Sequence, residues 1–136
     1  MFRVLSVAAS AIALLGMTAL SASAAPASHV KPKVHNFSIP GTTGISAWGN
    51  YSRSGSSVHI TVCLKETSPK VITAVAGGTA FGQNPTHHQS VDATVIGRDK
   101  QACRSITTKD TAELWVSAIS STADGHMHIG KVKRVY

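Results

Sequence analysis

Apolar and polar positions alternate along most of the chain after residue 41. The segments Ile45–Ser52 and Val58–Lys65 each carry apolar or small residues at every second position. Because successive side chains of a strand point to opposite faces, this period of two predicts half-buried β-strands. The same pattern predicts strands over residues 91–96, 101–108 and 114–119. The segment 71–81 is apolar or small at both phases, which predicts a central strand with a bulge at Gly77-Gly78.

Turns separate these strands at intervals of roughly 8–12 residues. Ser54-Gly55-Ser56 and Ala123-Asp124-Gly125 have the composition of hairpin turns. We expect a turn over residues 97–100, a loop over 82–88, and a last strand over His126–Tyr136. No window outside the leader shows a helical period of 3.6. The pattern therefore predicts an all-β fold, a small antiparallel sandwich or barrel of about seven strands.

The first 24 residues have the three regions of a secretory signal peptide. Arg3 supplies the positive charge, residues 4–20 are apolar and uncharged, and small residues suit cleavage after Ala24 or Ala27. A transmembrane anchor is the alternative, but this apolar run is shorter than the roughly 20 residues that span a bilayer. No second run of that length follows. We expect a secreted, extracellular protein without a membrane anchor after cleavage, and the Ala- and Ser-rich leader is typical of bacteria.

Residues 25–40 mix prolines with basic residues and show no regular period. This segment contains Pro26, Lys31, Pro32, Lys33 and Pro40. The composition predicts a flexible, basic N-terminal arm, followed by an all-β domain over residues 41–136. The arm would either tether the protein electrostatically or serve as a spacer.

The two cysteines, Cys63 and Cys103, are predicted to form a disulfide. In an exported chain, an even cysteine count without a CxxC spacing favours a disulfide over a reactive or metal-binding thiol. Both cysteines fall at the polar phase of their strands. The bond should therefore lie at an edge or on an outer face, and should not cross the core between two sheets.

The chain is basic, with 13 Lys and Arg against 6 Asp and Glu. Loss of Arg3 with the leader leaves a net charge of +6 on the remaining 112 residues. A basic balance attracts polyanions, although many small secreted proteins are simply basic and soluble. We predict an anion-binding surface that combines the basic residues Lys31, Lys33, Arg53, Lys131 and Lys133. Lysines on the last strand also have a simpler interpretation, since they discourage pairing with another sheet.

The aromatic residues do not indicate a specific nucleic-acid interface. Such an interface adds aromatic platforms to the basic groups, and the few aromatic residues here are separated in the sequence. Trp48 and Trp115 alternate with apolar neighbours. We therefore favour a place in the core for both, over a role as exposed platforms.

His126 and His128 form an HxH motif in the predicted last strand. Residues i and i+2 of a strand share a face, so the two imidazoles would begin a zinc or copper site. A third ligand would have to come from His87-His88 or from the arm. Two exposed histidines beside a hairpin turn are the alternative interpretation, since an HxH motif alone is a weak signal.

No catalytic motif is present, and the acidic residues are scattered along the chain. We predict no enzyme activity and no cofactor. The leading hypothesis is a secreted binding or structural protein that associates with anionic extracellular or cell-envelope material. One alternative is an inhibitor of an extracellular enzyme such as a protease, acting through the 82–88 loop on a stapled scaffold. The other alternative is an extracellular metal-binding protein that uses His126 and His128.

Overall fold

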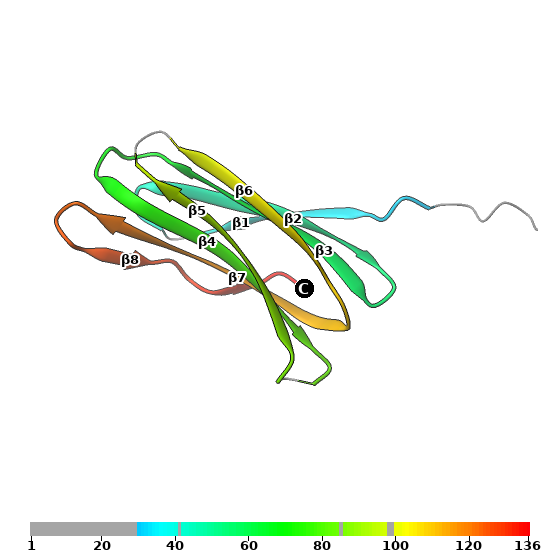
Figure 1. Ribbon diagram of the computed structural model, residues 1–136. Coiled ribbons are helices and arrows are strands. Elements are labelled where there is room, and N and C mark those ends of the chain that lie inside the picture. The colour runs from blue at the N-terminus through cyan, green and yellow to red at the C-terminus, as the bar shows by residue number, and fades with distance from the viewer. Residues whose placement is uncertain (1–29, 41, 85, 98–99) are drawn as a thin grey trace, which may run out of the picture. The chain divides into compact units, whose positions relative to one another are not determined.

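The computed structural model describes residues 30–136, except residues 41, 85, 98 and 99. The predicted leader and residues 25–29 lie outside this part of the chain. In this described part of the chain, nine strands form two antiparallel sheets (Figure 1). Their bounds are β1 Val34–Ile39, β2 Ile45–Ser54, β3 Ser57–Glu66, β4 Val71–Gly82, β5 His88–Ile96, β6 Gln101–Thr108, β7 Thr111–Thr122, β8 Met127–Ile129 and β9 Lys133–Arg134. Within the described residues, no helix is long and apolar enough to cross a bilayer.

The two sheets pack face to face as a sandwich, so the all-β expectation is confirmed. The first sheet has the order β1-β2-β3-β6, and the second has the order β5-β4-β7-β8, with β9 also paired to β7. The chain passes between the sheets at β3–β4, β5–β6 and β6–β7. Consequently β1 lies at one edge of the first sheet, beside the β8–β9 edge of the second, and β6 lies beside β5 at the other side.

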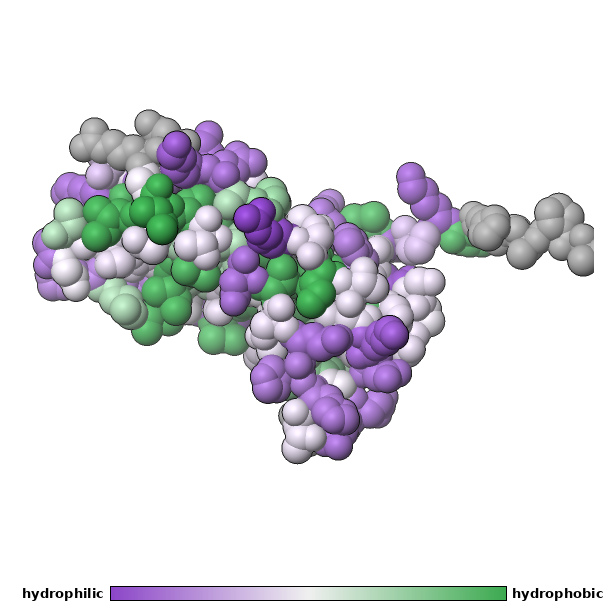
Figure 2. All heavy atoms as spheres, viewed as in Figure 1, coloured by the Kyte–Doolittle hydropathy of each residue, from purple (hydrophilic) through white to green (hydrophobic). Residues whose placement is uncertain are grey.

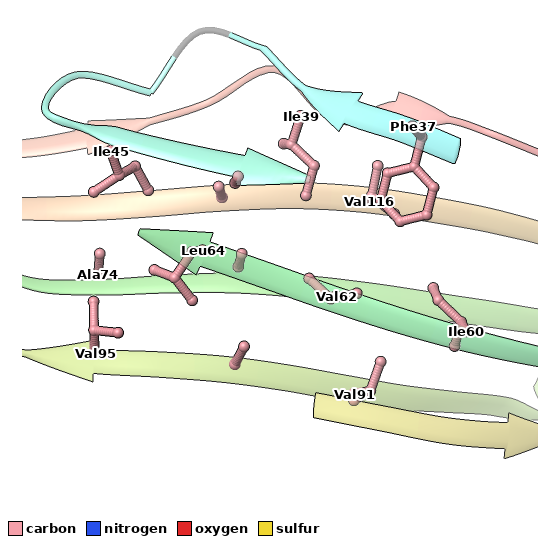
Figure 3. Close-up of a cluster of buried hydrophobic side chains, with 14 of the residues drawn as sticks. Phe37, Ile39, Ile45, Ile60, Val62, Leu64, Ala74, Val91, Val95 and Val116 are labelled. Atoms are coloured by element: carbon pink, nitrogen blue, oxygen red, sulfur yellow. The ribbon is translucent and has the colours of Figure 1, made fainter. Parts of the chain in front are cut away.

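The core follows the predicted alternation. Val58, Ile60, Val62 and Leu64 are almost completely buried on one face of β3, and Figure 3 shows the last three of them. They face small and branched residues of the second sheet, among them Ala74, Ala76, Leu114 and Val116. Burying each such branched side chain contributes roughly 1.5–3 kcal/mol to folding, before the loss of conformational entropy is counted.

Gly77 and Gly78 do not form the predicted bulge. Both pair in continuous register with β5 and β7, and the register shifts fall near the ends of β4 instead. The glycines are needed for close packing: a Cβ at Gly78 would lie 2.6 Å from Cδ1 of Ile60 in the opposite sheet. The prediction of a central strand is confirmed, and that of its bulge is wrong.

The expectation of a flexible arm is corrected for residues 34–39, which form β1. This strand pairs with β2 over its whole length, and Phe37 and Ile39 are buried. Gly49 makes room for Phe37, since a Cβ there would lie 2.5 Å from the ring's Cζ atom. Pro32 and Pro40 flank the strand and do not interrupt it. The prediction of a flexible arm, which was based on composition, did not take this spacing into account.

The last predicted strand is divided into β8 and β9. Both pair with β7, and the chain between them departs from regular pairing around Gly130. The Gly130 N–H donates to the Ala118 carbonyl at 2.7 Å, and a Cβ on Gly130 would lie 3.1 Å from the Pro40 carbonyl oxygen. This close approach to the segment after β1 favours glycine and separates the two short strands.

Trp48 and Trp115 are not core residues. Their neighbours Ala47, Leu114 and Val116 take the inward positions, so each tryptophan points to the outer face of its sheet and is only partly buried. The apolar residues that alternate with the tryptophans are the ones that point into the core, and the tryptophans occupy the opposite, outward phase.

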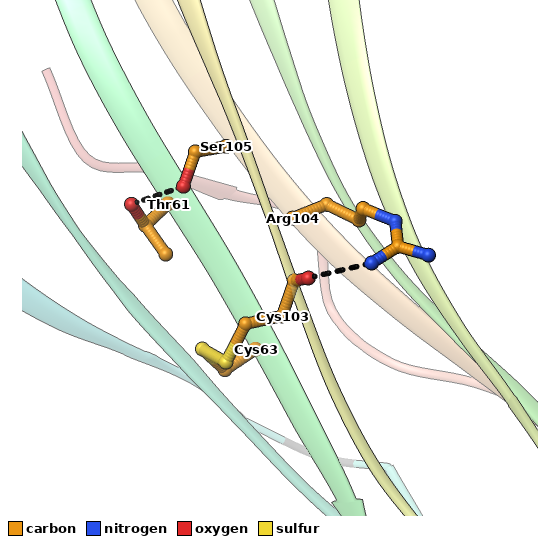
Figure 4. Close-up of a disulfide and its surroundings, with 5 residues drawn as sticks. All are labelled: Thr61, Cys63, Cys103, Arg104 and Ser105. Carbon is orange, nitrogen blue, oxygen red and sulfur yellow. Dashed lines mark hydrogen bonds between the residues drawn. A yellow bond between two sulfur atoms is a disulfide. The ribbon is translucent and has the colours of Figure 1, made fainter.

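The predicted disulfide is confirmed, and it lies on the outer face of the first sheet. Cys63 of β3 and Cys103 of β6 are direct partners in the strand register, with Cα atoms 4.1 Å apart (Figure 4). Because β6 is an edge strand, the bond fastens that edge to β3. It joins two strands of one sheet and does not cross the core, as the polar phase of both cysteines predicts.

Candidate binding surfaces

Four of the five predicted anion-binding residues lie along one side of the sandwich, and we define the basic rim as these four, Lys33, Arg53, Lys131 and Lys133. Lys31 is exposed and precedes β1 by three residues. This side of the sandwich is formed by β1 of the first sheet and the β8–β9 segment of the second. A contact between the sheets marks it: the Lys133 Nζ atom lies 3.4 Å from the Ser38 carbonyl oxygen on β1 and donates to it.

One end of the basic rim gathers basic and aromatic side chains. Lys33 immediately precedes β1, and because Val34 pairs with Ser52, Lys33 lies beside the end of β2 that carries Arg53. The Arg53 guanidinium carbon lies 5.0 Å from the centre of the Tyr136 ring, a cation–π arrangement. The Arg53 Nε atom also donates to the Gly55 carbonyl at 2.7 Å. These two contacts hold the cation in place at the surface.

Tyr136 continues a column of rings that the sequence did not predict. Its ring centre lies 5.7 Å from that of Tyr51, and Tyr51 stacks on His35 with centres 5.0 Å apart and planes 12° from parallel. These residues come from β1, β2 and the C-terminal segment. No local pattern connects them, so only the tertiary fold reveals the column.

The other two lysines extend the basic rim along β1. Lys133 reaches Ser38, four residues beyond Val34. Lys131 follows Gly130, which packs beside Pro40 at the far end of the strand. None of the described acidic residues belongs to β1, β8 or β9. The nearby Glu113 carboxylate is already paired with Arg134, at 3.2 Å.

The histidine motif lies where the β7–β8 turn leads into β8. His126 closes the β7–β8 turn, where its carbonyl accepts the Thr122 N–H at 3.0 Å, and β8 begins only at Met127. This bond continues the β7–β8 pairing by one residue, to the position directly before β8. Its Nε2 atom lies 3.9 Å from Oδ2 of Asp124, whereas His128 is partly buried in β8.

The structure does not join the two histidine pairs. His87 and His88 lie by the β4–β5 turn, and His126 and His128 lie near the other end of β7. No group of three or more His, Cys, Asp or Glu side chains suited to a metal is found in the described ranges.

Asp124 is held in its ionised form by the β7–β8 turn. The Thr122 hydroxyl and then the His126 backbone N–H donate to its carboxylate. These hydrogen bonds lower the pKa of Asp124 from its ordinary value of 3.8. The carboxylate therefore stabilises the turn.

The 82–88 loop, proposed as an inhibitory loop, is fastened by its own hydrogen bonds. The Gly82 N–H donates to the His87 carbonyl at 3.0 Å, and the Asn84 side chain accepts the Thr86 N–H at 3.1 Å. The loop borders a depression of about 570 Å³ together with Lys109. The disulfide lies in the opposite sheet and does not staple this loop.

A wider groove lies on the outer face of the second sheet, which the sequence did not predict. Its volume is about 740 Å³, and it is lined by Phe81, Trp115, Val132 and the polar residues Gln83 and Glu113, among others. The Trp115 indole N–H donates to Oε2 of Glu113 at 2.9 Å. We call it the Trp115 groove. Its signal in the sequence is Trp115 at the outward phase of β7.

No known protein family, curated protein or solved structure matches this chain. The structure presents two candidate binding surfaces, the basic rim and the Trp115 groove.

Proposed function

We propose that this protein is a non-catalytic binding protein that associates with a linear anionic polymer of the cell envelope through its basic rim. The observation that carries the proposal is the row of cations along β1, which no acidic residue of β1, β8 or β9 interrupts. The predicted signal peptide supports an extracellular place for this activity.

The shape of the basic rim favours an extended partner. β1 is six residues long, or roughly 20 Å at the rise of a strand. Lys33 and Arg53 lie at its start, Lys133 lies along it, and Lys131 lies near its end. A polymer that carries one anionic group every few ångströms meets such a row of cations in succession, and each contact releases counterions.

The chemistry of the Arg53 end favours phosphate or carboxylate groups. A guanidinium matches both groups with two parallel hydrogen bonds. Because Arg53 already lies over Tyr136, it loses less side-chain freedom on binding than a freely moving arginine would. The exposed lysines add positive charges on flexible side chains, which can reach anionic groups at a range of positions.

Co-sedimentation with an isolated cell-wall fraction tests the proposal, at about 0.05 to 0.5 M salt. The rim variant is Lys33→Gln/Arg53→Gln/Lys133→Gln. The control variant, Lys65→Gln/Lys70→Gln/Lys100→Gln, removes the same charge from exposed residues that are not on the basic rim. We expect salt-sensitive sedimentation of the wild type and of the control variant, and loss of most sedimentation in the rim variant.

Either of two results would contradict the proposal. One is no sedimentation of the wild type at the lowest salt concentration. The other is an equal loss of sedimentation in the rim and control variants, which would mean that net charge alone causes the association.

The hydrogen-bonded 82–88 loop favours one second candidate, an inhibitor of an extracellular protease. An ordered loop loses little entropy on binding to an active site. Inhibition of secreted proteases that is insensitive to salt and is lost on Asn84→Ala substitution would support this candidate, because Asn84 fastens the loop.

A further inference from the structure

The outer face of the second sheet carries more exposed apolar surface than folding requires. Ile119 of β7 and Ile129 of β8 are paired neighbours and are 38% and 67% exposed. Val132, beside the Trp115 groove, is 63% exposed. In Figure 2, hydrophobic residues gather over the region where β4, β7 and β8 lie. Surface of this kind is typical of a binding site.

The Trp115 groove combines aromatic and polar groups. Trp115 and Phe81 supply apolar ring surface from neighbouring strands, and Gln83, Glu113 and Ser117 supply amide, carboxylate and hydroxyl groups. A pyranose ring presents the same combination, with apolar C–H faces and hydroxyl groups around its rim. Aromatic faces carry partial negative charge that attracts C–H groups, and the polar side chains would bond the hydroxyls.

The Trp115 side chain is positioned before any ligand arrives. Its N–H is taken by Glu113, and Glu113 is in turn held by Arg134 of β9 at 3.2 Å. Because the one polar atom of the indole is already satisfied, the part of the ring that lines the groove is apolar. A fixed aromatic surface binds with a smaller entropic cost than a mobile one.

The charge balance of the groove favours a neutral ligand. Glu113 is its one described acidic lining residue, and Arg134 compensates it. The groove is also open to solvent along the sheet. An open groove leaves one side of a ligand in water, which suits a sugar better than a wholly apolar molecule.

We propose that the Trp115 groove binds a neutral oligosaccharide, with pyranose rings packed on Trp115 and Phe81 and hydroxyls bonded to Gln83 and Glu113. The volume of about 740 Å³ lies within the range of ligand sites. None of the rim residues lines this site, although Val132 lies between Lys131 and Lys133 in the chain. The proposed sugar binding does not rest on the proposed association with polyanions.

Fluorescence tests the proposal, because the chain contains two tryptophans on opposite sheets. Trp48→Phe leaves Trp115 as the single reporter in the groove. Trp115→Phe leaves Trp48, which is paired with Cys63 on the first sheet. The probes are β-1,4-linked hexamers of glucose and of N-acetylglucosamine. Sorbitol is the control, because it has the hydroxyls without a ring.

We expect at least one hexamer to shift the emission of the Trp48→Phe variant, with a dissociation constant on the order of 1 mM. The shift should be unaffected by salt, absent with sorbitol and absent in Trp115→Phe. Glu113→Gln should weaken binding by roughly tenfold, because it removes a charged hydrogen-bond acceptor.

Saturation-transfer NMR of the wild-type protein with the same hexamers provides a second readout. Sugar signals from the wild type that are lost in Trp115→Phe would support the site. The proposal is overturned if neither hexamer gives a signal by either method, or if Trp115→Phe responds as the wild type does. Binding that disappears as salt rises would also overturn it and would point to the basic rim.

Discussion

The outward faces of the two sheets differ, although both belong to one small sandwich. On the outer face of the first sheet, side chains of β3 and β6 form hydrogen bonds with each other. Thr61 bonds to Ser105 at 2.7 Å, and His59 bonds to Thr107 at 3.0 Å. The disulfide lies in the same row. On the second sheet, the corresponding positions of β7 and β8 carry Ile119 and Ile129.

This difference is what we expect if one face has a structural role and the other has the binding role proposed above. An antiparallel sheet commonly presents polar residues to water, as the first sheet does. The second sheet departs from that rule at its outward β7–β8 positions and at the Trp115 groove. Departures of this kind are expected at functional sites, because folding alone does not require them.

The largest expected effect comes from breaking the covalent link in the first sheet. Cys63→Ala/Cys103→Ala should lower the free energy of unfolding by about 2–5 kcal/mol, because the bond closes a long loop. The two cysteines are 40 residues apart. Urea denaturation of the wild type and the variant measures this. Hexamer binding in the Trp115 groove should persist in the folded variant, since the second sheet does not contain the bond. An unchanged midpoint would contradict the structural role of the first face.

An intermediate test removes the apolar surface of the second face. Ile119→Thr/Ile129→Thr should lower the free energy of unfolding by no more than about 2 kcal/mol, because Ile129 is 67% exposed and Ile119 is 38% exposed. It should also reduce the binding of a hydrophobic dye. The matched variant Thr61→Ala/Ser105→Ala on the first face should leave dye binding unchanged. Destabilisation by more than about 3 kcal/mol would show that the isoleucines are packing residues.

The smallest expected effect concerns the turn that leads into β8. Since the pKa of Asp124 is lowered in the folded state, its ionised form adds stability above pH 3.8. That contribution is lost as the pH falls through the lower folded value. Asp124→Asn should therefore lower the melting temperature slightly near neutral pH, and the difference from the wild type should vanish in acid. A difference that is constant across this pH range would mean that the carboxylate charge plays no part.

The sequence was informative where local periodicity decides the structure. The alternation of β3 predicts its buried face, and the phase of the cysteines predicts where the disulfide lies. The same alternation places Glu66 on the buried face of β3, and its side chain is 3% exposed. The prediction was wrong for β1. The flanking prolines and the lack of a regular period suggested a flexible arm, but residues 34–39 form a strand in which Phe37 and Ile39 are buried.

The binding surfaces depend on contacts between distant parts of the chain. Arg53 meets Tyr136, and Lys133 meets Ser38, only because the edges of the two sheets lie side by side. The charges of the basic rim were predicted from composition, but its linear arrangement required the fold. The Trp115 groove was missed because the apolar neighbours of Trp115 suggested burial.

The salt dependence of binding to a defined linear polyphosphate tests the central claim most directly. The logarithm of the binding constant should fall linearly with the logarithm of salt concentration for the wild type. In the rim variant, the slope of this log–log plot should be smaller in magnitude by about two to three. Each phosphate contact that is lost reduces the slope by about one. The control variant should keep nearly the wild-type slope. A wild-type slope near zero, or identical slopes in both variants, would contradict a polyanion-binding role for the basic rim.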